Sequence, residues 1–274
     1  MVPMSLKRIL VPLDGSEVAE AIVPYAAGLA KIVGAGLVLF QARGADEEAG
    51  PVESHLEDVA AGLRMNNLGV ATDSEQGEPA AAIIAAVRRY EAGLIVMTGH
   101  ATIAGRKDLL GSTAHSVLRG CTVPVLVLPL NATSYNPPAA VVVGHDGSAS
   151  ANTALEPSAS LARALNCELV LVRAVEPVAG LGGAAKYYSA VDDFAEDDLK
   201  KLQQNLADTG LTVTTHVGKR PADQEMLGVA GSRRGAIIAV STTSMGSQPN
   251  VLGSTTDRLV RSQSHPVLAV PAGS

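Results

Sequence analysis

Aromatic residues are scarce in this sequence. It has no tryptophan, two phenylalanines and five tyrosines among its 274 residues, so aromatics make up 3% of it. Surfaces that bind single-stranded nucleic acids stack bases on aromatic side chains, so no such surface is expected. Lysine and arginine number 21 against 27 aspartates and glutamates, a net charge of -6, and never run beyond two in a row. A basic groove for nucleic acid is therefore not expected either.

Cysteine and long apolar segments are also scarce. The two cysteines, Cys121 and Cys167, are too few for a disulfide framework or a zinc site, and their apolar surroundings predict two buried thiols. The longest apolar runs, such as residues 80–87, fall well short of the ~20 residues that a membrane helix needs. The first residues lack the layout of a signal peptide. We therefore expect a cytoplasmic protein with no membrane partner.

Familiar catalytic motifs are missing too. The sequence contains no Gly-x-Ser-x-Gly elbow, no Gly-x-x-x-x-Gly-Lys-Ser/Thr loop and no His-Glu-x-x-His, and its six histidines are dispersed. Residues 180–185 fit the Gly-x-Gly-x-x-Ala fingerprint of dinucleotide sites, but they do not follow directly on a predicted strand. We interpret that segment as a flexible loop, and we assign no catalytic residue.

What the sequence does contain is an internal repeat. Residues 9–16, an apolar run ending in Asp-Gly-Ser, recur at 141–148 with an offset of 132. Farther along the chain the offset is 142, and there the Gly-Ser-Thr at 111–113 recurs at 253–255. Shared landmarks in one order indicate a duplicated unit. The change of offset predicts an insertion of ten residues in the middle of the second copy.

The two copies are predicted to be separate domains of one fold class. The polar, proline-rich stretch at 131–138 is typical of a linker, which gives domains at 1–130 and 137–274. In the first copy we expect strands at 8–13, 36–42, 68–72, 93–97 and 123–128, and helices at 17–33, 52–63, 79–90 and 112–119. Apolar strands that alternate with helices imply an α/β fold, with two tandem open parallel sheets of five strands flanked by helices.

Two features of each copy are suited to a ligand site. Asp14 and Asp146 follow the first strand of each copy, and ligands of open parallel sheets bind beyond the carboxyl ends of strands. Gly111 and Gly253 precede helices, where free N–H groups and the helix dipole suit phosphate. Taken alone, each feature is more typical of a turn or a helix cap than of a ligand site. Their joint recurrence favours a ligand site.

The order of these motifs resembles the universal stress protein family, as a tandem member, over nearly the whole chain. The resemblance implies a Rossmann-like fold of the adenine nucleotide alpha hydrolase type. Nucleotide-binding members hold ATP or a related adenine nucleotide, with the Asp near base and sugar and the phosphates on a Gly-x-x-Gly…Gly-Ser/Thr loop. The binding residues so implied are Pro12, Asp14, Gly15, Ser16, Val38, Gly99, His100, Gly111, Ser112 and Thr113 in the first copy and Asp146, Gly253, Ser254 and Thr255 in the second.

Neither copy keeps the full glycine pattern. Counted back from Gly111 and Gly253, the family's glycine positions hold Thr98 and Ala101 in the first copy and Val240 and Thr243 in the second. The first copy still has Gly99 nearby and the basic pair 106–107 in its loop. We therefore expect an adenine nucleotide in the first copy, ATP being accompanied by Mg²⁺, and a degenerate second copy.

An alternative follows from the missing glycines, namely a regulator that binds no nucleotide and acts through its surfaces. In either case the resemblance implies a role in stress response, with slow ATP hydrolysis at most. The last strands, 123–128 and 265–270, each carry a proline, as edge strands do. In the family such strands pair between subunits, so we expect the two copies to form an intramolecular pseudo-dimer. Whole chains could associate further as a homodimer.

Overall fold

The computed structural model describes residue 4 and residues 6–99, 110–175, 185–242 and 252–271. The first half contains β1 (Arg8–Leu13), α1 (Glu17–Glu20), α2 (Val23–Val33), β2 (Gly36–Arg43), α3 (Ala49–Arg64), β3 (Val70–Gln76), α4 (Pro79–Arg89), β4 (Leu94–Thr98), α5 (Ser112–Gly120) and β5 (Val125–Leu128). The second half contains β6 (Ala140–Gly144), α6 (Ala149–Leu165), β7 (Glu168–Ala174), α7 (Ala185–Ala207), β8 (Val213–Gly218), α8 (Ala222–Gly231), β9 (Ile237–Ser241), α9 (Ser254–Ser262) and β10 (Val267–Val270).

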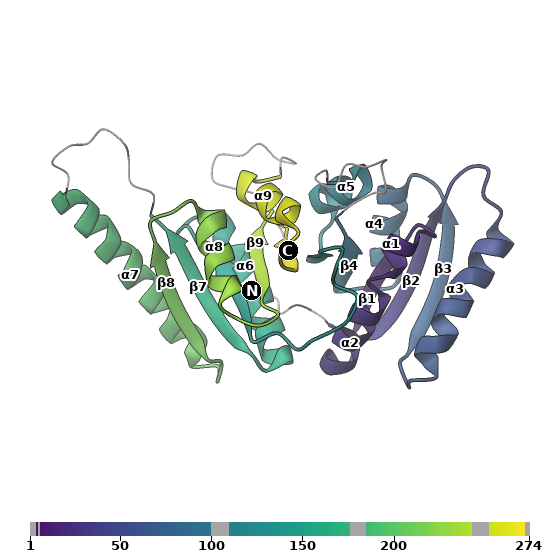
Figure 1. Ribbon diagram of the computed structural model, residues 1–274, viewed down its shortest axis with the longest axis horizontal. Coiled ribbons are helices and arrows are strands. Elements are labelled where there is room, and N and C mark those ends of the chain that lie inside the picture. The colour runs from purple at the N-terminus through teal and green to yellow at the C-terminus, as the bar shows by residue number, and fades with distance from the viewer. Residues whose placement is uncertain (1–3, 5, 100–109, 176–184, 243–251, 272–274) are drawn as a thin grey trace.

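The two halves lie side by side and share one ten-stranded sheet (Figure 1). The strand order is β3-β2-β1-β4-β5-β10-β9-β6-β7-β8. Neighbouring strands are parallel within each half, whereas β5 and β10 pair antiparallel, with Leu126 opposite Leu268. The predicted α/β class with two five-stranded parallel sheets is confirmed. The pairing of the two last strands within one chain, which makes the pseudo-dimer, is confirmed as well.

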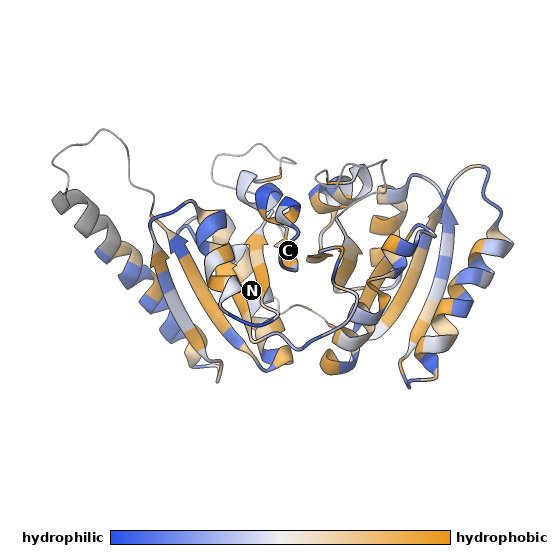
Figure 2. Ribbon diagram, viewed as in Figure 1, coloured by the Kyte–Doolittle hydropathy of each residue, from blue (hydrophilic) through white to orange (hydrophobic). Residues whose placement is uncertain are grey.

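Most strands of this sheet are rich in hydrophobic residues (Figure 2). Their side chains form a core on each face of the sheet. Successive residues of β1 alternate between the two faces: Ile9 packs toward α2 and α3, and Leu10 toward α4 and α5. Both cores continue across the β5–β10 pair into the second half. Of the two thiols, Cys121 is buried as predicted, whereas Cys167 is only half-buried. No helix among the described residues has the length and apolar character to cross a membrane.

Three local departures from the predicted elements have physical reasons. The helix expected at 17–33 is two helices, because Pro24 has no N–H and stands in the first turn of α2. The third strand is longer than expected, since β3 lies at the edge of the sheet and its polar sequence carries no apolar signal. In the second copy α7 has 23 residues where α3 has 16, so the insertion lengthens a helix. Residues 180–184 of the fingerprint-like segment lie outside the described residues.

Candidate functional site

Each half has a cleft at the carboxyl ends of its first and fourth strands. These two strands are neighbours in the sheet, and this is where ligands of open parallel sheets bind. The first cleft, whose empty space of about 640 Å³ includes open solvent, is lined by Pro12, Leu13, Asp14, Ala19, Ala42, Pro79, Ile83, Met97, Thr98, Gly111, Thr113 and Ala114. The second, whose empty space of about 630 Å³ likewise includes open solvent, is lined by Gly144, His145, Asp146, Ser148, Ser150, Ala151, Val172, Ala174, Ala222, Met226, Val240, Ser241, Thr255 and Thr256.

The turn after β1 fixes Asp14 at the first cleft. Gly15 has a φ of +74°, a left-handed conformation that glycine adopts without strain. The Oδ1 atom of Asp14 accepts hydrogen bonds from the backbone N–H of Ser16 at 3.0 Å and from its hydroxyl at 2.5 Å. The Ser16 hydroxyl oxygen in turn accepts from the N–H of Ala19 and caps α1. The other oxygen, Oδ2, has no hydrogen-bond partner among the described residues.

The second copy repeats this turn. Gly147 has a φ of +84°, and Asp146 Oδ1 accepts from the N–H of Ser148 at 2.9 Å. Ser148 caps α6 by accepting from the N–H of Ala151 at 3.1 Å. The Asp-Gly-Ser tripeptide is thus both a strand-to-helix turn and a part of the cleft, so the two interpretations of the motif are compatible.

The helices α5 and α9 begin at the clefts without a side-chain cap, because their N-cap residues are Gly111 and Gly253. The N–H of Gly111 donates to the carbonyl of Gly99 at 2.8 Å, and the N–H of Gly253 donates to the carbonyl of Thr242 at 2.8 Å. The N–H groups of the first helical turn have no partner within the helix. Together with the helix dipole they suit an anionic group.

These two carbonyl contacts show that Gly99 and Thr242 are structurally equivalent. The connection runs from 99 to 111 in the first copy and from 242 to 253 in the second, where it is one residue shorter. Counting back by a fixed number from the helix therefore compared residues that are not equivalent. The first copy has glycine at this position and the second has threonine. Residues 100–109, which include His100 and the basic pair 106–107, and residues 243–251 lie outside the described residues.

The structure brings most of the implied first-copy residues together. Pro12, Asp14, Gly111 and Thr113 line the cleft. Gly15, Ser16 and Ser112 belong to the turn and the helix start beside it. Val38 is elsewhere: it pairs with Leu10 in the middle of β2 and is 1% exposed. Ala42, at the end of the same strand, lines the cleft instead.

The apolar wall of the first cleft was not anticipated from the sequence. It includes Ala42, Ile83 and Met97, which come from β2, α4 and β4. The signal that could have revealed two of them is positional. The last residues of parallel strands that face the same side as Asp14 meet at one edge of the sheet.

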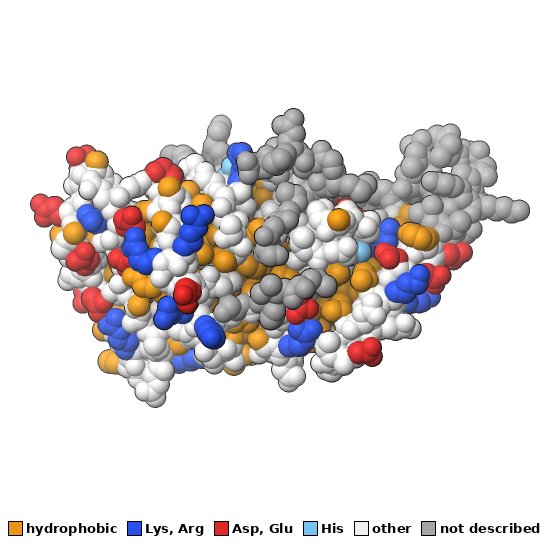
Figure 3. Space-filling view, turned by 180° about the vertical axis from the view of Figure 1, so that it is seen from behind, with side chains coloured by type: hydrophobic (Ala, Val, Ile, Leu, Met, Phe, Trp, Pro, Cys, Tyr) orange, Lys and Arg blue, Asp and Glu red, His pale blue; other side chains and the backbone are white. Residues whose placement is uncertain are grey.

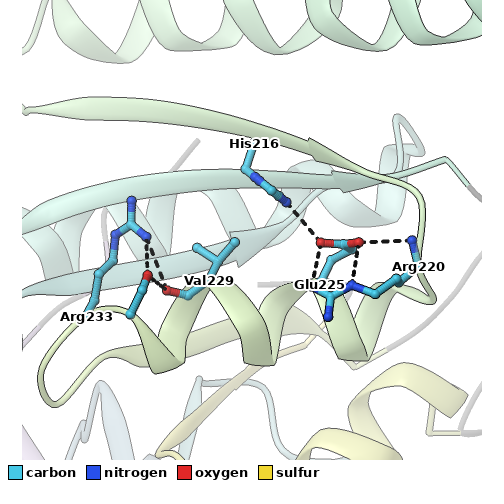
Figure 4. Close-up of polar contacts among 6 residues, drawn as sticks. His216, Arg220, Glu225, Val229 and Arg233 are labelled. Carbon is cyan, nitrogen blue, oxygen red and sulfur yellow. Dashed lines mark hydrogen bonds and ion pairs between the residues drawn. The ribbon is translucent and has the colours of Figure 1, made fainter.

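The second cleft differs in polarity. His145 replaces Leu13; its Nε2 lies 2.9 Å from Asn152 Oδ1, and its Nδ1 is buried with no hydrogen-bond partner. Glu225 follows Pro221 as Ile83 follows Pro79, but its side chain turns toward His216 and Arg220 (Figure 4). Of the implied second-copy residues, Asp146 and Thr255 line this cleft. Gly253 and Ser254 begin the helix beside it.

In the part of the chain that the structure describes, no group of three or more His, Cys, Asp or Glu side chains could hold a metal ion.

Comparison with known proteins decides the family. A model of the Universal stress protein family matches residues 5–129 and again 139–271, nearly the whole chain. The chain belongs to the universal stress protein family. Its two matches make it a tandem universal stress protein, as the motif order predicted. No curated protein matches the chain.

Solved structures show the same fold. A universal stress protein from Archaeoglobus fulgidus DSM 4304 is 20% identical, with a TM-score of 0.74 over 97% of this chain and 98% of that one. A functionally unknown protein from Pseudomonas aeruginosa PAO1 is 16% identical, with a TM-score of 0.71 over 98% and 94% of the two chains. At these identities the likeness concerns the fold of the universal stress protein, not its ligand.

Proposed function

We propose that this tandem universal stress protein acts in stress response by binding an adenine nucleotide, ATP, ADP or AMP, in its first cleft. The observation that carries the proposal is the convergence of three complementary surfaces there. They are the Asp14 carboxylate, an apolar wall that includes Ile83 and Met97, and the uncapped start of α5 behind Gly111. An adenine nucleotide has a group to match each of them: a sugar for the carboxylate, a base for the apolar wall and a phosphate for the helix start.

Each group of the nucleotide has a counterpart in the cleft. The free oxygen of Asp14 can accept a hydrogen bond from a ribose hydroxyl, and the apolar wall can cover the base. The N–H groups after Gly111 and the hydroxyls of Ser112 and Thr113 can donate to phosphate oxygens. Mg²⁺ would then enter with the phosphates of ATP, since the described residues offer no metal cluster.

The second cleft is proposed to be degenerate for nucleotide. Thr242 stands where the first copy has Gly99, and a side chain hinders close backbone approach to a phosphate. His145 puts a buried polar ring at the position of an apolar leucine. The competing proposal is a nucleotide-free regulator, which the incomplete glycine pattern of both copies supports. The cytoplasmic location and the homodimer stay predictions.

The test begins with the purified full-length chain. With no tryptophan and five tyrosines the protein absorbs weakly at 280 nm, so one bound adenine would raise the 260 nm absorbance clearly. Isothermal titration with ATP and AMP should then give one site per chain. A protein that carries no nucleotide and takes up none would favour the nucleotide-free regulator.

Two matched substitutions assign the cleft. Asp14→Ala should weaken binding by about tenfold or more, because a hydrogen bond to a charged group contributes about 1.5–3 kcal/mol. Asp146→Ala removes the same turn residue from the second copy and should leave the affinity unchanged. Asp14→Asn retains an acceptor for the Ser16 turn, and so separates loss of charge from loss of the turn. Loss of binding in Asp146→Ala alone would place the nucleotide in the other cleft.

A further inference from the structure

Gly99 of the first half packs against a helix of the second half. A Cβ atom built on Gly99 would lie 3.0 Å from Cγ1 of Val127, 3.3 Å from Cγ1 of Val260 and 3.6 Å from Nε2 of Gln263. The last two residues belong to the end of α9. Any side chain at position 99 would therefore push on α9 as well as on β5. The second half thus forms part of the wall behind Gly99.

This end of α9 is tied to the first half. Gln263 is the C-cap of α9, and its side-chain Oε1 accepts a hydrogen bond from the N–H of Leu130 at 3.1 Å. Its Nε2 donates to the carbonyl of Val260 at 2.9 Å. One amide therefore joins the last turn of α9 to the backbone just after β5. These two hydrogen bonds fix the Gln263 side chain beside Gly99.

Gly99 in turn holds the start of α5. Its carbonyl accepts the N–H of Gly111 at 2.8 Å, and Gly111 is both the N-cap of α5 and a lining residue of the first cleft. A displacement of Gly99 would shift the N–H groups that follow Gly111. Binding groups of this kind must be held within about 0.5 Å of their productive positions.

The residues that make this contact are not repeated at the equivalent positions of the other half. The second-copy equivalent of Gly99 is Thr242, which already carries a side chain. At the repeat offset of 142, Val260 corresponds to Leu118 in α5 and Gln263 to Cys121, the C-cap of α5. A cysteine cannot make the two amide hydrogen bonds of Gln263. Among the described residues, the glycine and the glutamine occur together where α9 of the second half meets Gly99 of the first.

We propose that Val260 and Gln263 of α9 are positioning residues for the first cleft, and that through Gly99 they set its affinity for the phosphate part of a nucleotide. The inference rests on the proposed function. It gives the second half a role in the site through α9 rather than through its own cleft.

The experiment compares ATP with adenosine, which lacks the phosphates. Titrations on the full-length chain would cover the parent, Val260→Ala and Gln263→Ala. In both variants we expect the affinity for ATP to fall about three- to tenfold, which lies within the range for substitutions that act at a distance, and the affinity for adenosine to stay unchanged. Gln263 is only half-buried, so its variant should fold. Leu259→Ala is the control, because Leu259 is buried in the same helix but is not among the three closest neighbours of a side chain at Gly99.

The outcomes separate the two proposals. If the parent binds ATP and both variants bind it equally well, the positioning role is wrong and the proposed function stands. An equal loss of affinity for ATP and adenosine would indicate a general structural effect and would also overturn the inference. A parent that binds no nucleotide would overturn both proposals. Finally, Gly99→Ala should weaken ATP binding, and adding Val260→Ala should restore part of it, because the second change removes one of the two clashing methyl groups.

Discussion

At the scale of single residues, Glu225 is a buried carboxylate held by several partners. It is 4% exposed and accepts hydrogen bonds from the N–H and Nε of Arg220 at 3.0 and 2.9 Å and lies 3.0 Å from Nε2 of His216 (Figure 4). A Cβ at Gly218 would overlap its carboxyl group, so glycine is needed there. The Arg220 hydrogen bonds, and then that of His216, lower the pKa of Glu225 to about 2.

This lowered pKa predicts how stability depends on pH. The ordinary value is 4.5 and the folded value about 2, so the contribution of Glu225 is fully present above 4.5 and is lost as the pH falls toward 2. Glu225→Gln should cost about 1–2 kcal/mol at pH 7, since the partners are partly exposed, and should flatten the pH dependence in that window. Urea unfolding at pH 7, 4.5 and 3 measures both effects.

An exposed carboxylate provides the comparison for Glu225. Glu196→Gln removes a surface partner of Lys200 and should change the free energy of unfolding by less than about 0.5 kcal/mol. Curves for Glu225→Gln and the parent that stay parallel between pH 4.5 and 3 would contradict the assignment.

At the scale of elements, the segment between the two halves packs against α2 through Tyr135. Tyr135 packs over Gly28 of α2, and its ring meets that of Tyr25 edge to face, with centroids 5.2 Å apart. A Cβ at Gly28 would overlap the Tyr135 side chain. Burial raises the pKa of Tyr135 to about 12. The glycine in α2 therefore serves the contact, although glycine is unfavourable inside a helix.

Substitution of Gly28 should show this conflict between propensity and packing. Gly28→Ala should destabilise the protein by about 1–3 kcal/mol through overpacking, even though alanine is the better helix former by about 1 kcal/mol. In a background of Tyr135→Ala the penalty should disappear. Gly62→Ala in α3, where nothing lies within 4 Å of the new Cβ, should instead stabilise. Chemical unfolding of the four variants tests the idea, and additive effects of the Gly28 and Tyr135 changes would refute it.

At the scale of the whole molecule, the two halves form one body because β5 and β10 make the sheet continuous. The core clusters on both faces include residues of both halves. Seen from behind, hydrophobic side chains show over the middle of the molecule, while charged ones lie mainly toward its two ends (Figure 3). The core that the two halves share is thus apolar on both faces of the sheet.

A continuous core predicts one cooperative unfolding transition. Differential scanning calorimetry should give a calorimetric enthalpy equal to the van't Hoff enthalpy. Leu268→Ala at the β5–β10 pair and Leu56→Ala in α3, both fully buried, should each lower this single transition, at a cost of about 2–5 kcal/mol. Two separated transitions in either variant would show that the halves unfold independently.

Much of this protein could be predicted from its sequence. The repeat, the α/β class and the Asp-Gly-Ser turn could be predicted because they depend on local patterns. Neighbouring residues determine the periodicity of strands and helices and the chemistry of turns. Asp14 and Gly111 could be placed at one end of the sheet because parallel strands end together. The prolines of the last strands marked them as edge strands, and the resemblance to the family then implied the pairing of β5 with β10.

The tertiary structure alone decided the details that depend on residues far apart in the chain. Ala42 rather than Val38 lines the first cleft, because the register of β2 against β1 sets which residue reaches the end of the sheet. The equivalence of Gly99 with Thr242 became visible only through hydrogen bonds to the next helix. The contact between Gly99 and Val260 joins two domains, and no local pattern records it, because it arises only when two separately encoded halves pack together.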